Sequence, residues 1–430
     1  MKKIIFVLLS IIAFQSNAQM DNLTNLSVEW MRTGARNAAT NGTDIAVYNP
    51  AGLTHLTEGV HLNFSNQSLF RSPSHSYNLG MGEGEKMHTQ TGSDPFLPEL
   101  FFAYNKSKFA LYAAAYMAGG GATMNYPDGS LTTDLIALGV LQAAGGGYMS
   151  TSKQSLKASS MYLTMMAGAA YSLSKNISAS LSIRNISAKN TAEGGMTLTA
   201  SPFDFPDQPL AIDYEENANG VGAVVGINAN FDGFTISARY ESKVKLDFKT
   251  KQNKDDFGIT VDGQMNRRDL PAVAGIGMAY SLSSKTKAYV DMNYFFQTDA
   301  DWGKSTLATN ERPLSQLAGN AYGLGLGFEY AMNEKLTACM GGGYTKYMYE
   351  DKAGYYTHLG TYEVMQDNNA NINSGFGYQA TSKLKLNAAF MHTFWASDQN
   401  IKTLLAQPLD VDVKVNNSMN AIALGLEINF

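Results

Sequence analysis

Thr43-Asp44-Ile45-Ala46-Val47-Tyr48-Asn49-Pro50-Ala51-Gly52-Leu53 differs from everything else in this chain of 430 residues. It stands just before a long series of segments in which apolar and polar residues alternate. Pro50 fixes its own φ and favours an extended Asn49, while Gly52 permits a turn that a side chain would resist. We therefore expect a compact, kinked segment. If the strands that follow close into a barrel, a segment of this length fits inside the lumen as a plug, or hatch.

The last ten residues form a second distinctive segment, in which two kinds of residue alternate. The apolar positions are Ile422, Leu424, Leu426, Ile428 and Phe430, and the small or polar positions are Ala421, Ala423, Gly425, Glu427 and Asn429. A period of two is that of a β-strand with one apolar face. A soluble sandwich can also end in such a strand. The terminal aromatic residue, Phe430, resembles the signal by which the assembly machinery recognises bacterial outer-membrane barrels, and we favour that class.

From Val60 onward the chain predicts strands of about ten residues, joined alternately by short turns and long polar loops. The short turns are rich in turn-forming residues and lie at 105–108, 174–176, 232–233, 283–285, 333–335 and 382–383. The long segments lie at 71–96, 119–158, 192–219, 250–269, 298–319, 350–370 and 395–417. This pattern predicts an all-β fold, an antiparallel transmembrane barrel of about fourteen strands over residues 60–430, preceded by a hatch over residues 19–59.

The first eighteen residues predict a secretory signal peptide. Lys2-Lys3 precede an apolar run over residues 4–14, and Ser16-Asn17-Ala18 places small residues at the two positions that determine cleavage. We expect cleavage between residues 18 and 19. Because no cysteine follows that point closely, we do not expect a lipoprotein anchor.

The composition fits a membrane barrel and argues against several other classes. Charged residues make up 16% of the chain and aromatic residues 11%, as expected when lipid-facing and water-facing residues alternate. After residue 18, no apolar run approaches the roughly 20 residues of a spanning helix. The net charge is −5 and there is no basic run, so we expect no nucleic-acid partner. The single cysteine, Cys339, can form no internal disulfide.

The strand pattern also predicts which side chains face the lumen. An Arg or Lys at the bilayer centre costs about 2–4 kcal/mol, so charges within strands should point inward. The predicted lipid-facing positions include Met161, Met165, Tyr171, Val221, Val225, Leu324 and Leu326. The predicted inward charges are Arg184, Arg239, Glu241, Asp291, Glu329, Lys385 and Glu427. We expect these charges to form a polar ladder that bonds the barrel to the hatch; the alternative is a role in moving a ligand's carboxylate.

One loop differs from the other loops because it is apolar at helical spacing. Within residues 131–144, Leu131, Leu135, Leu138 and Leu141 recur at close to a helical period, and Thr132 or Thr133 is a candidate N-cap. An exposed helix of this kind would offer a shallow ligand-binding groove for hydrophobic molecules. The alternative is that the helix folds back and seals the mouth of the barrel.

These features together resemble the FadL family, outer-membrane channels for long-chain fatty acids and other hydrophobic compounds. The matching hatch residues are Asn49, Pro50 and Ala51, followed by Gly52, with Gly34-Ala35-Arg36 and Tyr48 in similar surroundings. The strand count and the apolar loop helix agree with that family. The resemblance implies a monomeric barrel in the outer membrane of a Gram-negative bacterium, surrounded by lipid and lipopolysaccharide. It also implies passive uptake past a hatch that shifts, with a sideways exit through the barrel wall.

The sequence does not identify the ligand, because it shows no clear Arg or Lys that would bind a ligand carboxylate beside an apolar pocket. Fatty acids, aromatic hydrocarbons, sterols and haem are the candidates. Haem uptake requires a surface histidine ligand, for which His75, His88 and His358 are available. A protein of another class, a non-transporting adhesin or structural barrel, is the second hypothesis. We expect no enzyme, no cofactor and no metal site, because the six histidines show no metal-ligand spacing and adjoin no nucleophile motif.

Overall fold

The computed structural model describes residues 23–430 except 81, 83, 201–205, 305–311, 360–362, 364–365, 397–398 and 403–409. The predicted signal peptide lies outside the described residues. Within the described ranges, no helix is both long enough and apolar enough to cross a membrane.

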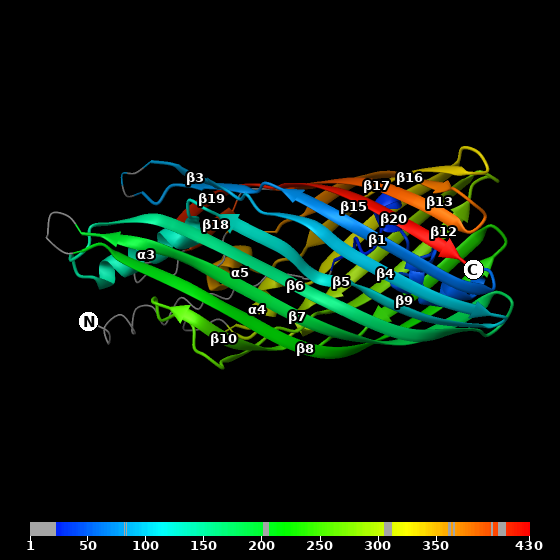
Figure 1. Ribbon diagram of the computed structural model, residues 1–430, viewed down its shortest axis with the longest axis horizontal. Helices are drawn as coiled ribbons and strands as arrows, with labels where there is room; N and C mark the ends of the chain where they lie inside the picture. The colour runs from blue at the N-terminus through cyan, green and yellow to red at the C-terminus, as the bar shows by residue number, and fades with distance from the viewer. Residues whose placement is uncertain are drawn as a thin grey trace.

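The described strands close into an antiparallel barrel of fourteen strands, as predicted (Figure 1). In chain order the strands are β1 (Gly59–Arg71), β4 (Ser93–Lys106), β5 (Phe109–Tyr126), β6 (Ser150–Ser172), β7 (Ile177–Thr199), β8 (Gln208–Phe231), β9 (Phe234–Glu241), β12 (Ala272–Ser281), β13 (Thr286–Phe296), β14 (Ala321–Ala331), β15 (Leu336–Tyr347), β16 (Asn369–Gln379), β17 (Leu384–Trp395) and β20 (Ser418–Asn429). The first and last strands pair with each other from His61↔Asn429 to Arg71↔Met419. The ring is therefore closed by the two ends of the chain.

The wall of the barrel is much taller on one side than on the other. β6, β7 and β8 have 23, 23 and 24 residues, whereas β12 to β17 have 10 to 12. At about 3.3 Å per residue, the long strands exceed what a bilayer requires. On the outer face of β7, the exposed apolar residues Leu181 and Ile183 are followed by Asn185 and Ser187. The upper half of this tall wall therefore stands in water, where β10 (Asp247–Asp255) and β11 (Met265–Arg267) extend it.

Strand alternation places side chains as the sequence predicts. The predicted lipid-facing residues Met165 and Val221 are 62% and 63% exposed. Among the predicted inward charges, the buried ones are Arg184, Glu241, Asp291, Glu329 and Glu427. Charges are thus kept away from lipid, where their transfer would be costly.

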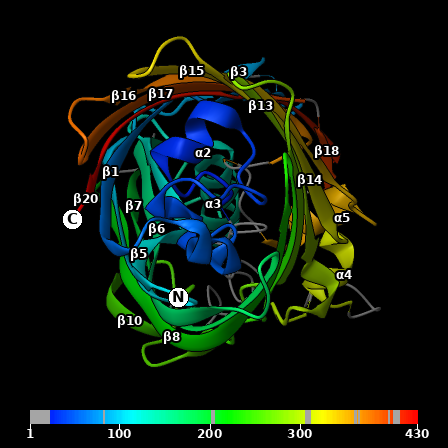
Figure 2. The same ribbon diagram turned by 90° about the vertical axis from the view of Figure 1, so that its right-hand side faces the viewer.

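The N-terminal residues 23–58 lie inside the barrel (Figure 2), and we call them the luminal segment. The segment contains α2 (Val28–Thr33), η1 (Thr43–Ala46) and η2 (Pro50–His55). Ser27 caps α2 by accepting a hydrogen bond from the Trp30 amide, and Gly34 ends the helix at a φ of 71°. Pro50 opens η2, where its missing N–H costs nothing.

The luminal segment is bound to the barrel wall by the inward-facing acidic residues. Asp291 Oδ2 accepts from the amides of Arg36 (2.5 Å) and Asn37 (2.8 Å), and Glu427 Oε1 accepts from the amide and hydroxyl of Thr43, both at 3.0 Å. These bonds satisfy backbone N–H groups that no helix or strand pairs.

The basic groups of the lumen are neutralised within the same network. Arg36 forms a fully buried ion pair with Asp44 at 2.6 Å. Arg239 donates to Glu241 at 2.8 Å and to the Tyr48 carbonyl at 3.0 Å, which ties the wall to the middle of the luminal segment. Each of these contacts removes a charge or a polar group from isolation inside the barrel.

A smaller assembly, which we call the cap, lies at the end of the barrel opposite the short turns and Phe430 (Figure 1). It consists of a second sheet, in the order β18-β19-β2-β3, and three helices. Its elements are β2 (Ser74–Tyr77), β3 (Lys86–Thr89), α3 (Leu131–Ala143), α4 (Leu314–Ala318), α5 (Lys352–Leu359), β18 (Gln399–Lys402) and β19 (Asp410–Asn416). Tyr77, Trp302, Leu317, Tyr355 and Val413 contribute to its hydrophobic core.

Close backbone contact between α2 and the wall generates a prediction. A Cβ at Gly341 would collide with the Thr33 carbonyl, whereas a Cβ at Gly323 would meet its nearest neighbour, Thr345 Oγ1, at 3.6 Å. We expect Gly341→Ala to loosen the luminal segment by about 1–3 kcal/mol. Limited proteolysis in detergent should show cleavage near α2, with the heat-resistant barrel intact. Gly323→Ala is the matched control, and equal protection of both variants would contradict the expectation.

Candidate functional site

The barrel wall is interrupted between β4 and β5. The two strands pair from Lys106↔Phe109 up to Leu100↔Ala115, and no ladder pairing above that point is found between their described residues. They are joined again near their upper ends, where Thr91 N donates to Asn125 O at 2.9 Å. We call the gap between residues 94–99 of β4 and 116–122 of β5 the window.

The local sequence explains why the two strands separate. Pro95 and Pro98 of β4 lack an N–H and cannot contribute to a ladder on that side. In β5, the register against β6 shifts at Met117/Gly119 and again at Gly120/Ala122, which are two β-bulges in succession. Gly120 has a φ of 69°, which a residue with a side chain rarely adopts.

On the outside of the barrel, the window is bordered by exposed apolar side chains. The exposed side chains beside it are Phe96 (67%), Leu100 (48%) and Met161 (50%), and Met161 pairs with Gly120 in the β5–β6 ladder. On the other side of β4, the carbonyl of Pro95 accepts from Ser68 Oγ of β1 at 2.7 Å, where the β1–β4 register shifts between Gln67 and Leu69.

The first described residues of the luminal segment lie directly behind the window. Leu23 N donates to the carbonyl of Ala118, in the bulged part of β5, at 2.9 Å. Tyr48 holds the next residues, because its hydroxyl donates to the Thr24 carbonyl at 2.9 Å and accepts from Leu26 N at 2.7 Å. The chain from Leu23 to Leu26 therefore covers the window from the inside.

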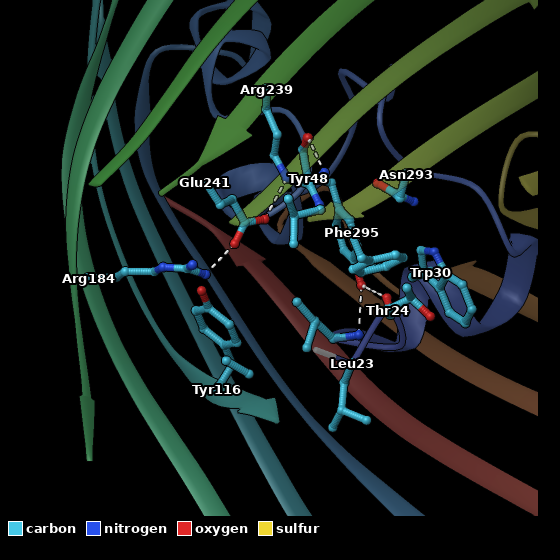
Figure 3. A pocket seen from close by; sticks show the side chains of 13 residues that line it. Leu23, Thr24, Trp30, Tyr48, Tyr116, Arg184, Arg239, Glu241, Asn293 and Phe295 are labelled. Atoms are coloured by element: carbon cyan, nitrogen blue, oxygen red, sulfur yellow. Dashed lines mark hydrogen bonds and ion pairs between the residues drawn. The ribbon is translucent and has the colours of Figure 1, made fainter. Parts of the chain in front are cut away.

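Two neighbouring cavities lie behind the window. The larger, of about 210 Å³, lies between the luminal segment and the cap. The smaller, of about 20 Å³, is shown in Figure 3. Both are lined by Leu23, Thr24, Trp30 and Phe295. Gly120 and Thr123 of β5 line the larger cavity, which therefore reaches the window.

The charged groups beside the smaller cavity are already paired. Figure 3 shows Glu241 between Arg184 and Arg239, with Tyr48 and Tyr116 nearby. Glu241 accepts from both guanidinium groups, and Arg239 also donates to Asn37 Oδ1 at 2.6 Å. This cluster holds the luminal segment in place rather than leaving a cation for a ligand.

The predicted ligand-binding helix forms, but it is not an exposed groove. Its N-cap is Ser130, not Thr132 or Thr133. Leu131 and Leu135 are 0% and 5% exposed because they pack into the cap core. Their prediction as surface capture residues was therefore wrong, and the alternative, in which the helix folds back over the mouth, describes the structure. The opposite side of α3 packs against the tall wall.

Two other leucines of that prediction, Leu138 and Leu141, remain partly exposed on α3. The predicted hatch residues Asn49, Pro50, Ala51 and Gly52 are buried and line neither cavity, although Tyr48 beside them lines the smaller one. Asn49 Nδ2 donates to Asn228 Oδ1 at 2.8 Å, and the Ala51 carbonyl accepts from Ser178 Oγ at 2.7 Å.

The histidines considered as haem ligands lie in strands and a helix of the cap and not in a surface loop. His75 is 2% exposed, and its Nε2 accepts from Leu131 N, at the start of α3, at 3.0 Å. Its ring lies close to those of Tyr77 and His88, with centroid distances of 5.9 and 5.6 Å. His75 is therefore not a surface ligand, which corrects that expectation. His88 Nε2 contacts the Tyr77 hydroxyl at 3.0 Å, and the side chain of His358 lies outside the described structure.

The window was missed by sequence reasoning. Its signals were present as Pro95 and Pro98 in one strand and Gly119-Gly120-Gly121 in the next. Without the strand register, nothing in the sequence shows that the prolines and the glycines face each other.

A closed, fourteen-stranded barrel with an occupied lumen and an apolar outer band is a barrel of the outer-membrane type. Solved structures share this fold. A Pseudomonas aeruginosa FadL homologue has a TM-score of 0.67 at 13% identity, covering 95% of this chain and 100% of that one. The P. putida toluene transporter TodX gives 0.66 at 13%, covering 96% and 99%. The Ralstonia pickettii toluene transporter TbuX gives 0.59 at 16%, covering 96% and 99%.

The chain therefore has the FadL-like fold that the sequence resemblance predicts. No protein-family model and no curated protein matches its sequence. At these identities the likeness describes the path of the chain, and the roles of individual residues have to be argued from the site itself.

The buried His75 predicts that the cap is sensitive to acid. Burial lowers the pKa of His75 from 6.5 to about 4, against the opposing effects of Glu363 and Asp134. Because the folded cap holds His75 neutral, the opened cap binds the proton more readily, and stability falls as pH drops from about 6.5 toward 4, by up to about 3 kcal/mol.

The measurement is proteolysis of the cap at pH 7 and pH 5. We expect faster cleavage at pH 5 in the parent and a smaller difference in His75→Gln, whose side chain still accepts from Leu131 N but does not titrate in this range. The same acid response in both proteins would refute the role of His75.

Proposed function

We propose that the protein is an outer-membrane channel through which small hydrophobic compounds move passively, with the window as their exit toward the membrane. The observation that carries this proposal is the unpaired stretch between β4 and β5, which connects a luminal cavity with the apolar outer surface. A barrel that only displays loops has no need for an unpaired wall, because each unsatisfied backbone group in lipid costs several kcal/mol.

The route has a simple physical basis. A hydrophobic solute is excluded by the polar lipopolysaccharide layer and gains free energy when its surface leaves water. A sideways exit delivers it from an apolar cavity into lipid without passage through free water. The partly exposed Leu138 and Leu141 on α3 supply apolar contacts at the surface end, where capture begins.

The moving part in this proposal is the start of the luminal segment. Residues 23–26 are held over the window by bonds between neutral groups, namely Leu23 with Ala118, Asn25 with Gln67, and the two bonds to the Tyr48 hydroxyl. The rest of the segment is fixed by Asp291, Glu427 and the Arg36–Asp44 pair. Displacement of the first few residues opens the window, while Asn49, Pro50, Ala51 and Gly52 stay in place as the closed hatch.

The solved structures with this fold support a hydrophobic ligand. Two of them are described as toluene transporters, and another as a monoaromatic hydrocarbon channel. Both long-chain fatty acids and monoaromatic compounds belong to the proposed class. A haem receptor is disfavoured because His75 is buried and already bonded to α3. The barrel acts as a monomer, inserted with the help of the exposed Phe430.

A pair of reversible crosslinks tests the exit route. We expect Leu23→Cys with Ala118→Cys, in a Cys339→Ser background, to form a disulfide that holds the start of the luminal segment over the window. Oxidation should reduce uptake of a hydrophobic tracer at least tenfold in cells that rely on this channel, and a reductant should restore it. Each single cysteine variant controls for the substitution itself.

The comparison crosslink is Ala51→Cys with Ser178→Cys, which fixes the hatch far from the window. We expect it to leave uptake unchanged. If this crosslink blocks uptake and the first does not, the ligand passes through the hatch instead. If neither blocks and the parent shows no uptake of any hydrophobic compound, the barrel is a structural or adhesive surface protein.

A further inference from the structure

The larger cavity has features that narrow the class of compound it can hold. Its volume is about 210 Å³. An apolar cavity of about 150 Å³ in a protein is known to hold benzene. The cavity therefore matches a single ring that carries one or two small substituents.

The apolar part of the lining suits an aromatic ring. Trp30, Phe295 and Trp395 contribute aromatic side chains, and Met124, Met391 and Met419 contribute thioethers. Aromatic rings pair favourably with one another in stacked or edge-on arrangements, and thioether sulfur contacts ring edges favourably. These side chains offer contacts to a flat ligand from both the luminal segment and the wall.

The charged part of the lining argues against an anion. Among the lining residues that the structure describes, the charged ones are Arg71 and Glu363. Arg71 forms an ion pair with Asp94. Glu363 accepts from the Thr132 amide at 3.1 Å and from its hydroxyl at 2.8 Å. A ligand carboxylate would enter a cavity that holds a carboxylate of the protein and a cation already engaged elsewhere.

The polar part of the lining includes two hydrogen-bond acceptors that lack a donor. Gln90 is 2% exposed, and its Nε2 donates to the carbonyls of Gly92 (3.1 Å) and Thr123 (3.3 Å), which fixes the orientation of the amide. Within the described structure, Gln90 Oε1 and Asn371 Oδ1 are buried without a hydrogen-bond donor. Both residues line the cavity. A buried acceptor left unpaired is costly, so a ligand that supplies an O–H gains affinity here.

We propose that this cavity selects uncharged single-ring compounds that carry a hydroxyl group, such as alkylphenols, over the matching hydrocarbons and carboxylates. The selection rests on the proposed channel function, in which the cavity is the binding site before exit. A phenolic hydroxyl titrates near pH 10, so it is neutral and donates a hydrogen bond at pH 7. The apolar lining takes the ring, and Gln90 or Asn371 accepts from the hydroxyl.

Calorimetric titration of the purified full chain in detergent at pH 7 tests the proposal. The probes are p-cresol, p-xylene, in which a methyl group replaces the hydroxyl, p-toluate, which is an anion, and 4-methylbenzylamine, which is a cation. We expect p-cresol to bind about tenfold more tightly than p-xylene, in keeping with one hydrogen bond to a buried acceptor, and both ions to bind more weakly than p-cresol. Equal affinity for p-cresol and p-xylene, or tighter binding of either ion, overturns the proposal.

Substitutions assign the preference to the two acceptors. Gln90→Leu and Asn371→Leu each remove one of them, and we expect the double variant to bind p-cresol no better than p-xylene. Thr393→Val changes another lining residue at constant shape and should leave the preference intact. Loss of the preference only in Thr393→Val, or its persistence in the double variant, overturns the assignment.

The binding measurement is independent of transport. If p-cresol binds selectively but uptake of hydrophobic compounds is absent, the selectivity stands and the channel function fails. If uptake occurs but p-cresol and p-xylene bind equally, the channel function stands and the selectivity fails.

Discussion

The demand that every backbone N–H and C=O in a bilayer finds a partner governs this structure. It closes β1 onto β20 and aligns fourteen strands in one ring. At the unpaired stretch between β4 and β5, this demand is met in part by other means. There, prolines remove donors, and Leu23 pairs with Ala118 from the inside.

Seen in this way, the luminal segment has two parts with different strengths of attachment. Its middle is fixed by buried acidic residues of the wall, which accept from backbone amides, and by ion pairs within the lumen. Its beginning is held at the window by a few bonds between neutral groups. In the proposed channel, the strongly held part stays in place as the hatch. The weakly held part is the one that is displaced, because segments with few buried contacts open most readily.

Local patterns explain which features the sequence could predict. Strand alternation and polar turns gave the fourteen strands, and the cost of charge in lipid gave the inward positions of Asp291, Glu329 and Glu427. The helix at Leu131 was predicted from its period, but its burial was not. The helical spacing of apolar residues shows that one face of the helix is apolar, but it does not show which part of the protein packs against that face. Here β19 and the tall wall pack against the helix, and both are remote from it in sequence. The window and its cavity depend on the register of β4 against β5, which no local pattern encodes.

The contacts of the luminal segment with the wall also bear on the order in which the molecule is assembled. The segment is made first, yet the groups that hold it include Asp291 on β13, Asn387 on β17 and Glu427 on β20, the last strand of the ring. It cannot reach its final position until the whole wall has been laid down around it. The first segment of the barrel is thus held in its final position only when the last strand is in place.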